Sequence, residues 1–482
     1  MATATTTAAP PPPAATTATW EDLYIIPSSF DDDDHGDEEG GEQEGGSSAA
    51  TTTATTTTRP PRVLAWPNAG PIVILPGFGN DTEDYESPFG DARRGLAPRL
   101  RRRGFVVETV RLRRRDWLRV ARALGSPAYW RGQADVAPGY YWYLLRVAAA
   151  VRRAEKKWME ANNEGENKEE KPRVVLVAHS AGGWLGRAFL GDAALRAAGV
   201  AEAAQREEDR AVAALGRATG LGGVREALAT AVEVLFSSPS SGRAAEEQAT
   251  PLPSAPRPCV EEPHPSVAAL VTLGTPHLPP APGSGARDVT GGALAWVNEQ
   301  WPGAFFGRRR RGGGGAAEEE EEQQRRRPSP VVYVTVAGRA VRGAPAEQSS
   351  DSSSGSPTAP RGSAPSYARE AYKAVAGGQG AGVVGDAVVP LHVASSSEED
   401  GGVGLPGADA SVVLDGVWHS MSRLGSFKEP PPSASGAAAG DKRGRDEGRA
   451  GGSRRGVRPW YGSGGAIDQW LAALKEEPTR RS

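Results

Sequence analysis

The segment Arg173 to Gly183 (RVVLVAHSAGG) places a serine on a short turn after an apolar strand, which is the sequence form of a nucleophile elbow. A serine that attacks a carbonyl must lie on a tight strand-to-helix turn, so Ala178, Ala181 and Gly182 beside it have to be small. Ala178 stands where the G-x-S-x-G pattern has glycine. Short motifs also match by chance, and the alternative is an ordinary turn. The pattern predicts that Ser180 is the nucleophile of a serine hydrolase.

A second strand and turn, Pro71 to Gly79 (PIVILPGFG), precedes this serine by about a hundred residues, where such hydrolases place their oxyanion loop. Two fixed N–H groups that face a developing oxyanion typically contribute a few kcal/mol each to transition-state stabilisation. We assign these donors to the backbone of Phe78 and Ala181. Gly77 would let the chain approach the substrate closely, while the alternative is a plain loop after a strand.

The acid and the base should follow the serine in the order Ser, Asp or Glu, His. Among the six histidines, His419 in SVVLDGVWHSM follows an expected strand near the end of the folded region and is the predicted general base. Asp386, in a Gly-rich loop after VVYVTVAG, is the predicted acid that orients its imidazole. Asp415 is a rival acid, but the loop would then have to fold back on itself.

Several aromatic residues are candidates for an apolar substrate pocket. Tyr129 and Trp130 in GSPAYWRG would line it, together with Gly77, His277 and Trp301. Core packing is the alternative for the aromatic residues. The cationic run Arg111 to Arg115 is interpreted as a solvated loop held by surface ion pairs, with contact to an anionic lipid headgroup as the alternative.

With these motifs the chain resembles a known family, the soluble α/β-hydrolases of cyanobacteria and plant plastids, which are described as lipase-like or esterase-like. The resemblance extends from about Arg62 to Leu474 and is carried by PIVILPGFGN at Pro71, VRLRRRDWL at Val110, LVAHSAGGWLGRAFLGD at Leu176, LVTLGTPH at Leu270, VNEQWPGAFF at Val297, VVYVTVAG at Val331, GDAVVPLHVA at Gly385, LDGVWHS at Leu414 and WYGS at Trp460. The elbow followed by TLGTPH is more distantly similar to inositol deacylases that act on glycolipid anchors.

This resemblance implies an α/β-hydrolase fold, with a mostly parallel sheet, helices on both faces and a triad of Ser180, Asp386 and His419. Ala178 and several long insertions depart from the family pattern. We expect cleavage of a carboxylic ester, from an acyl lipid or another lipophilic ester, through an acyl-serine intermediate and without a cofactor or metal. The alternative from a different class is a catalytically inactive hydrolase-fold protein that binds a lipid or a protein partner.

Composition narrows the class of protein. The chain has 482 residues, a formal net charge of −3 and one cysteine, Cys259, so we expect neither nucleic-acid binding nor an intramolecular disulfide. A single cysteine suits a reducing compartment. No stretch approaches the roughly 18 to 20 apolar residues of a membrane span, so any contact with a membrane is expected to be peripheral. The family resemblance favours a plastid location, with the cytoplasm as the alternative.

The chain divides into a tail and one interrupted domain. Residues 1–61 are low in complexity and predict a disordered tail and candidate targeting segment, while residues 62–476 predict one α/β domain. A cap-like insertion is expected at about 192–263, with an amphipathic helix over Leu221 to Phe236. Disordered loops are expected at about 308–328, 342–366 and 428–457.

The periodicity of apolar residues predicts strands and helices in alternation, as a parallel sheet requires. Helices are expected from Asp91 to Arg103, from Tyr140 to Asn162 and from Asp468 to Lys475, with a strand at 104–112. The second helix carries a stripe that we assign to core packing, formed by Tyr140, Tyr141, Tyr143, Leu144, Val147 and Val151.

Overall fold

The computed structural model describes residues 70–137, 139–162, 172–196, 262–307, 331–345, 359–420 and 458–479. The predicted tail, the predicted helix over Leu221 to Phe236 and the predicted loops at 308–328 and 428–457 lie outside these ranges. The predicted loop at 342–366 is narrower, because Arg342 belongs to a strand and a helix begins at Ala364. Within the described ranges, no helix is both long enough and apolar enough to cross a membrane.

Six strands form one parallel sheet, with the order β2-β1-β3-β4-β5-β8. Parallel strands need crossover connections, and the helices of these connections cover both faces of the sheet, so the strands read as continuous apolar runs. The sheet and its helices confirm the predicted α/β architecture. Its strands are β1 (Ile72–Leu75), β2 (Val107–Thr109), β3 (Val174–His179), β4 (Val267–Leu273), β5 (Val332–Arg339) and β8 (Ala410–Asp415).

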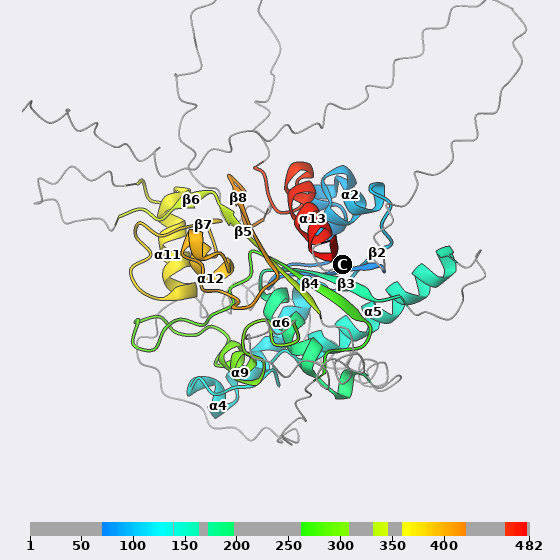
Figure 1. The fold of residues 1–482 in the computed structure, drawn as a ribbon. Helices are drawn as coiled ribbons and strands as arrows, with labels where there is room; N and C mark the ends of the chain where they lie inside the picture. The colour runs from blue at the N-terminus through cyan, green and yellow to red at the C-terminus, as the bar shows by residue number, and fades with distance from the viewer. Residues whose placement is uncertain are drawn as a thin grey trace, which may run out of the picture.

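Helices lie on both faces of this sheet (Figure 1). One face is covered by α5 (Tyr141–Asn162), α6 (Ala181–Gly191) and α9 (Ala293–Gln300), and the other by α2 (Leu96–Arg102) and α13 (Gly464–Thr479). Beside β5 and β8 lie α11 (Ala364–Ala376), α12 (Leu391–Ala394) and the antiparallel pair of β6 (Val341–Arg342) and β7 (Val384–Gly385). The remaining elements are short: α1 (Glu83–Glu86), η2 (Pro88–Gly90), η3 (Ala92–Arg94), η4 (Arg114–Val120), α3 (Ala121–Leu124), α4 (Pro127–Trp130), η5 (Ala194–Arg196) and η6 (Glu398–Asp400).

Strand β3 shows how the sheet divides the core. Val174, Leu176 and Ala178 pack into the cluster with α5 and α6, while Val175 and Val177 pack into the cluster with α2 and α13. This alternation follows from the period of two along a strand, and both sets are buried because both faces are covered. Strand β3 is therefore packed on both faces of the sheet up to the turn that follows it.

The expected helices are found with shifted ends. The segment Asp91 to Arg103 is divided between η3 and α2, the predicted closing helix begins earlier, at Gly464, and α5 agrees with the prediction to within a residue. In the stripe of α5, Tyr140, Tyr143, Leu144, Val147 and Val151 are buried in one core cluster, and the partly buried Tyr141 packs against it. Packing is therefore the role of this stripe.

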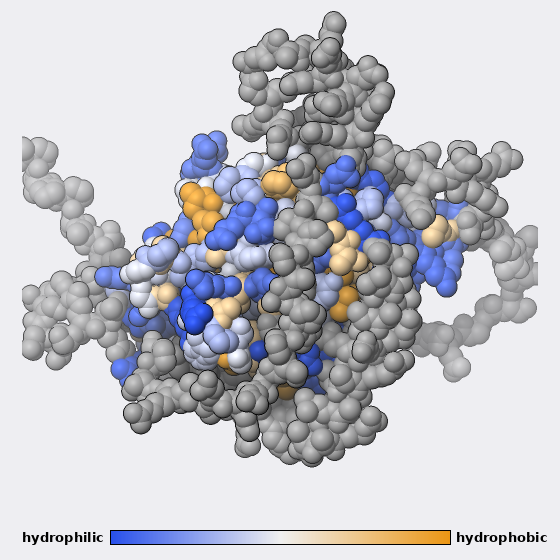
Figure 2. Space-filling model, turned by 90° about the horizontal axis from the view of Figure 1, so that it is seen from below, coloured by the Kyte–Doolittle hydropathy of each residue, from blue (hydrophilic) through white to orange (hydrophobic). Residues whose placement is uncertain are grey.

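The surface formed by the described residues exposes few large apolar side chains. Among the described residues these are Phe89, Trp130, Met159 and Val403. On the face in Figure 2, hydrophobic residues occur in small patches between hydrophilic ones.

Candidate active site

Ser180 lies between β3 and α6 in a strained conformation, with φ 52° and ψ −128°. Such angles are costly for a residue with a Cβ and persist only where the surrounding structure enforces them. A Cβ on Gly182 would stand 2.6 Å from the carbonyl oxygen of Leu75, and one on Gly183 would stand 2.1 Å from Oγ1 of Thr275. Small residues are therefore a steric requirement of this turn.

The turn after β1 meets this elbow at the carboxyl ends of the central strands. The chain passes from β1 to β2 on one side and returns to β3 on the other, and such a switch point opens a crevice between the strand ends. A Cβ on Gly77 would lie 2.7 Å from Cβ of Ser180. The two segments that were predicted to supply nucleophile and oxyanion donors are thus in contact.

Two tyrosines fix the start of this turn, which we call the oxyanion turn (Pro76 to Asn80). The Tyr143 hydroxyl donates to the carbonyl of Pro76 at 2.8 Å, and the N–H of Gly77 donates to the Tyr85 hydroxyl at 3.0 Å. Burial raises the pKa of Tyr143 and of Tyr85 well above the usual value of 10, so both hydroxyls keep their protons.

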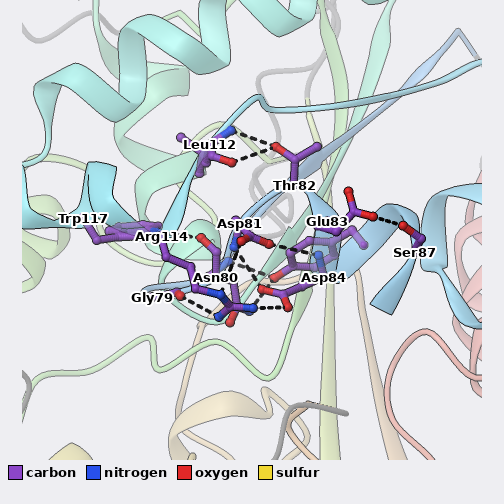
Figure 3. A network of polar contacts seen from close by, with 12 residues as sticks. Gly79, Asn80, Asp81, Thr82, Glu83, Asp84, Ser87, Leu112, Arg114 and Trp117 are labelled. Atoms are coloured by element: carbon purple, nitrogen blue, oxygen red, sulfur yellow. Dashed lines mark hydrogen bonds and ion pairs between the residues drawn. The ribbon is translucent and has the colours of Figure 1, made fainter. Parts of the chain in front are cut away.

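The end of the oxyanion turn is held by side chains from the β2–η4 region (Figure 3). Arg114 donates to the carbonyl of Gly79 at 3.2 Å and forms ion pairs with Asp81 and Asp84. Trp117 Nε1 donates to the carbonyl of Asn80 at 2.7 Å. Because the Arg114 side chain is 48% exposed, its ion pairs add little stability.

Among the described residues, two N–H groups of the oxyanion turn and the elbow lack a protein acceptor. Within the described part of the chain, neither the amide of Phe78 nor that of Ala181 donates to another residue. The Phe78 ring packs against Trp117, with centroids 5.1 Å apart. Both predicted oxyanion donors are therefore available to a ligand.

His419 and Asp386 form a buried pair. His419 Nδ1 bonds to Asp386 Oδ2 at 2.8 Å, and the His419 N–H donates to the Asp386 carbonyl at 2.9 Å. An ionised carboxylate only accepts hydrogen bonds, so Nδ1 carries the proton and Nε2 keeps a free lone pair. This is the tautomer that a general base needs.

Asp386 is only 1% exposed, yet its carboxylate is well satisfied. Oδ2 also accepts from the Tyr461 hydroxyl at 2.7 Å, and Oδ1 accepts from the N–H groups of Val388 and Val389 at 3.0 and 2.7 Å. Burial alone would raise the pKa of Asp386, but the attraction of His419 and these hydrogen bonds outweigh it and lower the pKa below 3.8. Asp386 is thus held in its ionised form.

The rival carboxylate has another partner. Asp415, at the end of β8, forms an ion pair with Arg339, with contacts of 2.5 and 3.1 Å. Asp386 is therefore the carboxylate that contacts His419, in agreement with the order of residues along the chain.

Ser180 is linked to this pair through its neighbour His179. The imidazole of His179 lies 4.7 Å from that of His419 between ring centroids, and its Nε2 bonds to the His419 carbonyl at 2.8 Å. Among the hydrogen bonds of the described residues, none joins Ser180 Oγ to His419 Nε2. Catalytic hydrogen bonds are often long before substrate binds. The structure thus brings acid and base into contact, and the residue that precedes the serine contacts the base.

The candidate pocket residues are placed differently. Tyr129 is buried and donates to the carbonyl of Val289 at 3.1 Å, while Trp130 is 55% exposed and stacks with Arg287 at 4.1 Å. His277 is fully buried and bonds to Thr272 Oγ1 at 3.1 Å, and the indole of Trp301 is buried against Gly191. These contacts favour packing over direct contact with a substrate for the buried residues.

A cavity of about 340 Å³ lies beside this site, and neither Ser180 nor His419 lines it. Its lining comes from α1, η2 and Ser420, which follows His419, and it includes the buried side chains of Tyr85 and Trp460.

The sequence alone did not reveal the supporting hydroxyls. Tyr143 and Tyr461 bond to the oxyanion turn and to Asp386 over 67 and 75 residues of chain, and Tyr85 bonds to Gly77 from eight residues away. A single tyrosine carries no spacing signal in any of these cases. For Tyr461 alone there was an indication in the sequence, because this residue belongs to WYGS, one of the segments that carry the family resemblance.

No protein-family model matches this chain, and no curated protein or solved structure shows significant similarity to it. Across the described residues, no cluster of three or more His, Cys, Asp or Glu side chains is arranged to hold a metal ion.

Proposed function

We propose that this protein is a serine hydrolase with an α/β-hydrolase fold, and that it cleaves carboxylic esters through an acyl-Ser180 intermediate. The observation that carries the proposal is the buried His419–Asp386 pair beside a serine on a strained turn. A packing role would not need an ionised carboxylate, a histidine with a free Nε2 and a strained serine at the same strand ends.

In this mechanism His419 Nε2 takes the proton of Ser180 as Oγ attacks the ester carbonyl. The oxyanion that forms is stabilised by the N–H groups of Phe78 and Ala181, and the N-terminus of α6 adds a favourable dipole. The imidazolium then returns its proton to the leaving alcohol, and water repeats the sequence on the acyl-enzyme. Asp386 stabilises the imidazolium without taking its proton.

The substrate class is proposed as acyl lipids or other lipophilic esters, and the location as the plastid. Both rest on the family resemblance of the sequence. The competing function is an inactive hydrolase-fold protein that binds a lipid or protein partner. The ionised Asp386 argues against it, because a binding site has no use for a buried charge that orients a base.

Labelling with a fluorophosphonate probe tests this proposal, since the probe reacts with an activated serine. We expect wild-type protein to be labelled and Ser180→Ala and His419→Ala to be unlabelled. Ser420→Ala, which removes the hydroxyl next to the base, is the matched control and should be labelled normally. A folded wild-type protein that resists the probe would favour the binding function. A series of p-nitrophenyl esters of increasing acyl length would then define the substrate class.

A further inference from the structure

The imidazole of His179 lies between the oxyanion turn and the loop of the base. It is 1% exposed, and both of its nitrogens are engaged. Nδ1 lies 2.7 Å from the Tyr85 hydroxyl, and Nε2 lies 2.8 Å from the carbonyl oxygen of His419. One side chain thus contacts groups that hold both halves of the candidate site.

The direction of these hydrogen bonds can be deduced. A carbonyl oxygen only accepts, so Nε2 of His179 must carry the proton and Nδ1 must be an acceptor. The Tyr85 hydroxyl therefore donates to Nδ1. Its oxygen in turn accepts from the N–H of Gly77 at 3.0 Å and from Asn80 Nδ2 at 2.9 Å. The chain of bonds runs in one direction from Gly77 through Tyr85 and His179 to His419.

This direction is stable to changes in pH. Burial, with a smaller contribution from His419, lowers the pKa of His179 to about 3. The imidazole therefore stays neutral wherever His419 could act as a base. Because both nitrogens are already bonded, His179 has no site from which to exchange a proton with Ser180.

We propose that His179 is a positioning residue that couples the oxyanion turn to the general base through this one-way chain of hydrogen bonds. The His419 carbonyl is held by His179 while the His419 N–H is held by Asp386, so the backbone that carries the base is fixed on both sides. At the other end, Tyr85 fixes the N–H of Gly77, next to the proposed donor Phe78. The inference rests on the proposed hydrolase function.

Two conservative variants separate the halves of the chain. In His179→Gln the amide N–H can replace Nε2 and keep the bond to His419, while the acceptor for Tyr85 is lost. In His179→Asn the amide oxygen can replace Nδ1 and keep the bond to Tyr85, while the bond to His419 is lost. Tyr85→Phe removes a single oxygen and breaks the chain without changing His179.

We would measure kcat and KM for an ester that wild type cleaves. Small displacements of reacting groups reduce rates by up to about 100-fold, so we expect kcat to fall about 10- to 100-fold in His179→Asn and His179→Ala, with KM little changed. Tyr85→Phe should lower kcat in the wild type, and by a smaller factor in His179→Gln, which already lacks the acceptor for Tyr85 but keeps the bond from Gly77 to Tyr85. His179→Gln itself should retain more activity than His179→Ala.

The results distinguish this inference from the function on which it rests. Wild-type protein that neither turns over esters nor reacts with the probe would refute the hydrolase itself. An active wild type whose folded His179 variants keep full kcat would refute the coupling alone, as would fully additive losses in Tyr85→Phe/His179→Gln. If the histidine variants fail to fold, Tyr85→Phe still decides, because unchanged kcat in this variant contradicts the chain.

Discussion

The two sides of the candidate site are built in different ways. The nucleophile side is local: Ser180 is held by a strained turn, and its neighbours are small because Leu75 and Thr275 leave no room for side chains. The base side is assembled from distant segments, since Asp386 is 33 residues from His419 and 75 residues from Tyr461. Steric constraint fixes the serine, whereas hydrogen bonds between segments fix the base.

This difference predicts different responses to substitution. On the nucleophile side, an added methyl group should disturb folding before it disturbs chemistry. On the base side, loss of a single polar atom should disturb chemistry while the surrounding backbone remains in place.

The largest effect is expected from Asp386→Asn. An amide in this position no longer stabilises the imidazolium and favours the wrong tautomer of His419, which in a Ser-His-Asp triad costs about 10⁴-fold in kcat. Asp415→Asn is the matched control, because it removes a partly exposed ion pair with Arg339 and should leave kcat unchanged. Steady-state ester hydrolysis measures both. A large loss in Asp415→Asn with little loss in Asp386→Asn would reverse the assignment of the acid.

The next effect concerns pH, because His179, beside the nucleophile, is one of three buried histidines that are held neutral. Burial lowers the pKa of His179 to about 3 and of His264 to about 4 from 6.5, and it lowers the pKa of His277 well below 6.5. The unfolded chain binds these protons and the folded chain does not, so the stabilising contribution is present above pH 6.5 and is lost as pH falls toward the folded pKa values. Each histidine should cost about 2 kcal/mol of unfolding free energy between pH 6.5 and pH 5.

Urea unfolding at a series of pH values measures this slope. His264, which stacks on Phe189 away from the site, is the suitable residue to replace. His264→Gln should reduce the change of unfolding free energy with pH by the contribution of one histidine. An unchanged slope in this variant would mean that His264 is not held neutral in the folded protein.

A smaller effect is expected from a methyl group at the elbow. Gly182→Ala places a Cβ 2.6 Å from the backbone oxygen of Leu75, and backbone cannot move as a side chain can. Such overpacking typically costs about 1–3 kcal/mol. Gly464→Ala, at the start of α13 with no atom within 4 Å of the added Cβ, is the control and should be neutral or slightly stabilising. Equal melting temperatures for the two variants would contradict the steric account of the nucleophile side.

The same difference explains what could be predicted from the sequence. The elbow and the oxyanion turn were readable because steric constraint is written in consecutive residues, as in Ala178 to Gly183. Asp386 and His419 were found through their order along the chain. Tyr85 and Tyr461 were not found as partners, because a long-range hydrogen bond leaves no local pattern. Trp130 illustrates another limit, since an aromatic residue in a sequence does not indicate whether it lies inside or, as here, on the surface.

The smallest expected effect comes from removing one buried tyrosine hydroxyl on the nucleophile side or one on the base side. Tyr143→Phe removes the donor to the Pro76 carbonyl, and Tyr461→Phe removes a donor to Asp386 and the acceptor of the Gly338 N–H. Each loss leaves buried groups unsatisfied and should cost about 1–3 kcal/mol of stability. Of these two hydroxyls, only that of Tyr461 contacts the ionised carboxylate, so its removal should raise the pKa of Asp386 and move the acid limb of an NMR titration of this carboxyl group to higher pH. The limb should not move in Tyr143→Phe. If both variants shift it equally, the hydroxyls act through general loosening of the site, and the distinction between a sterically fixed serine and a hydrogen-bonded base fails.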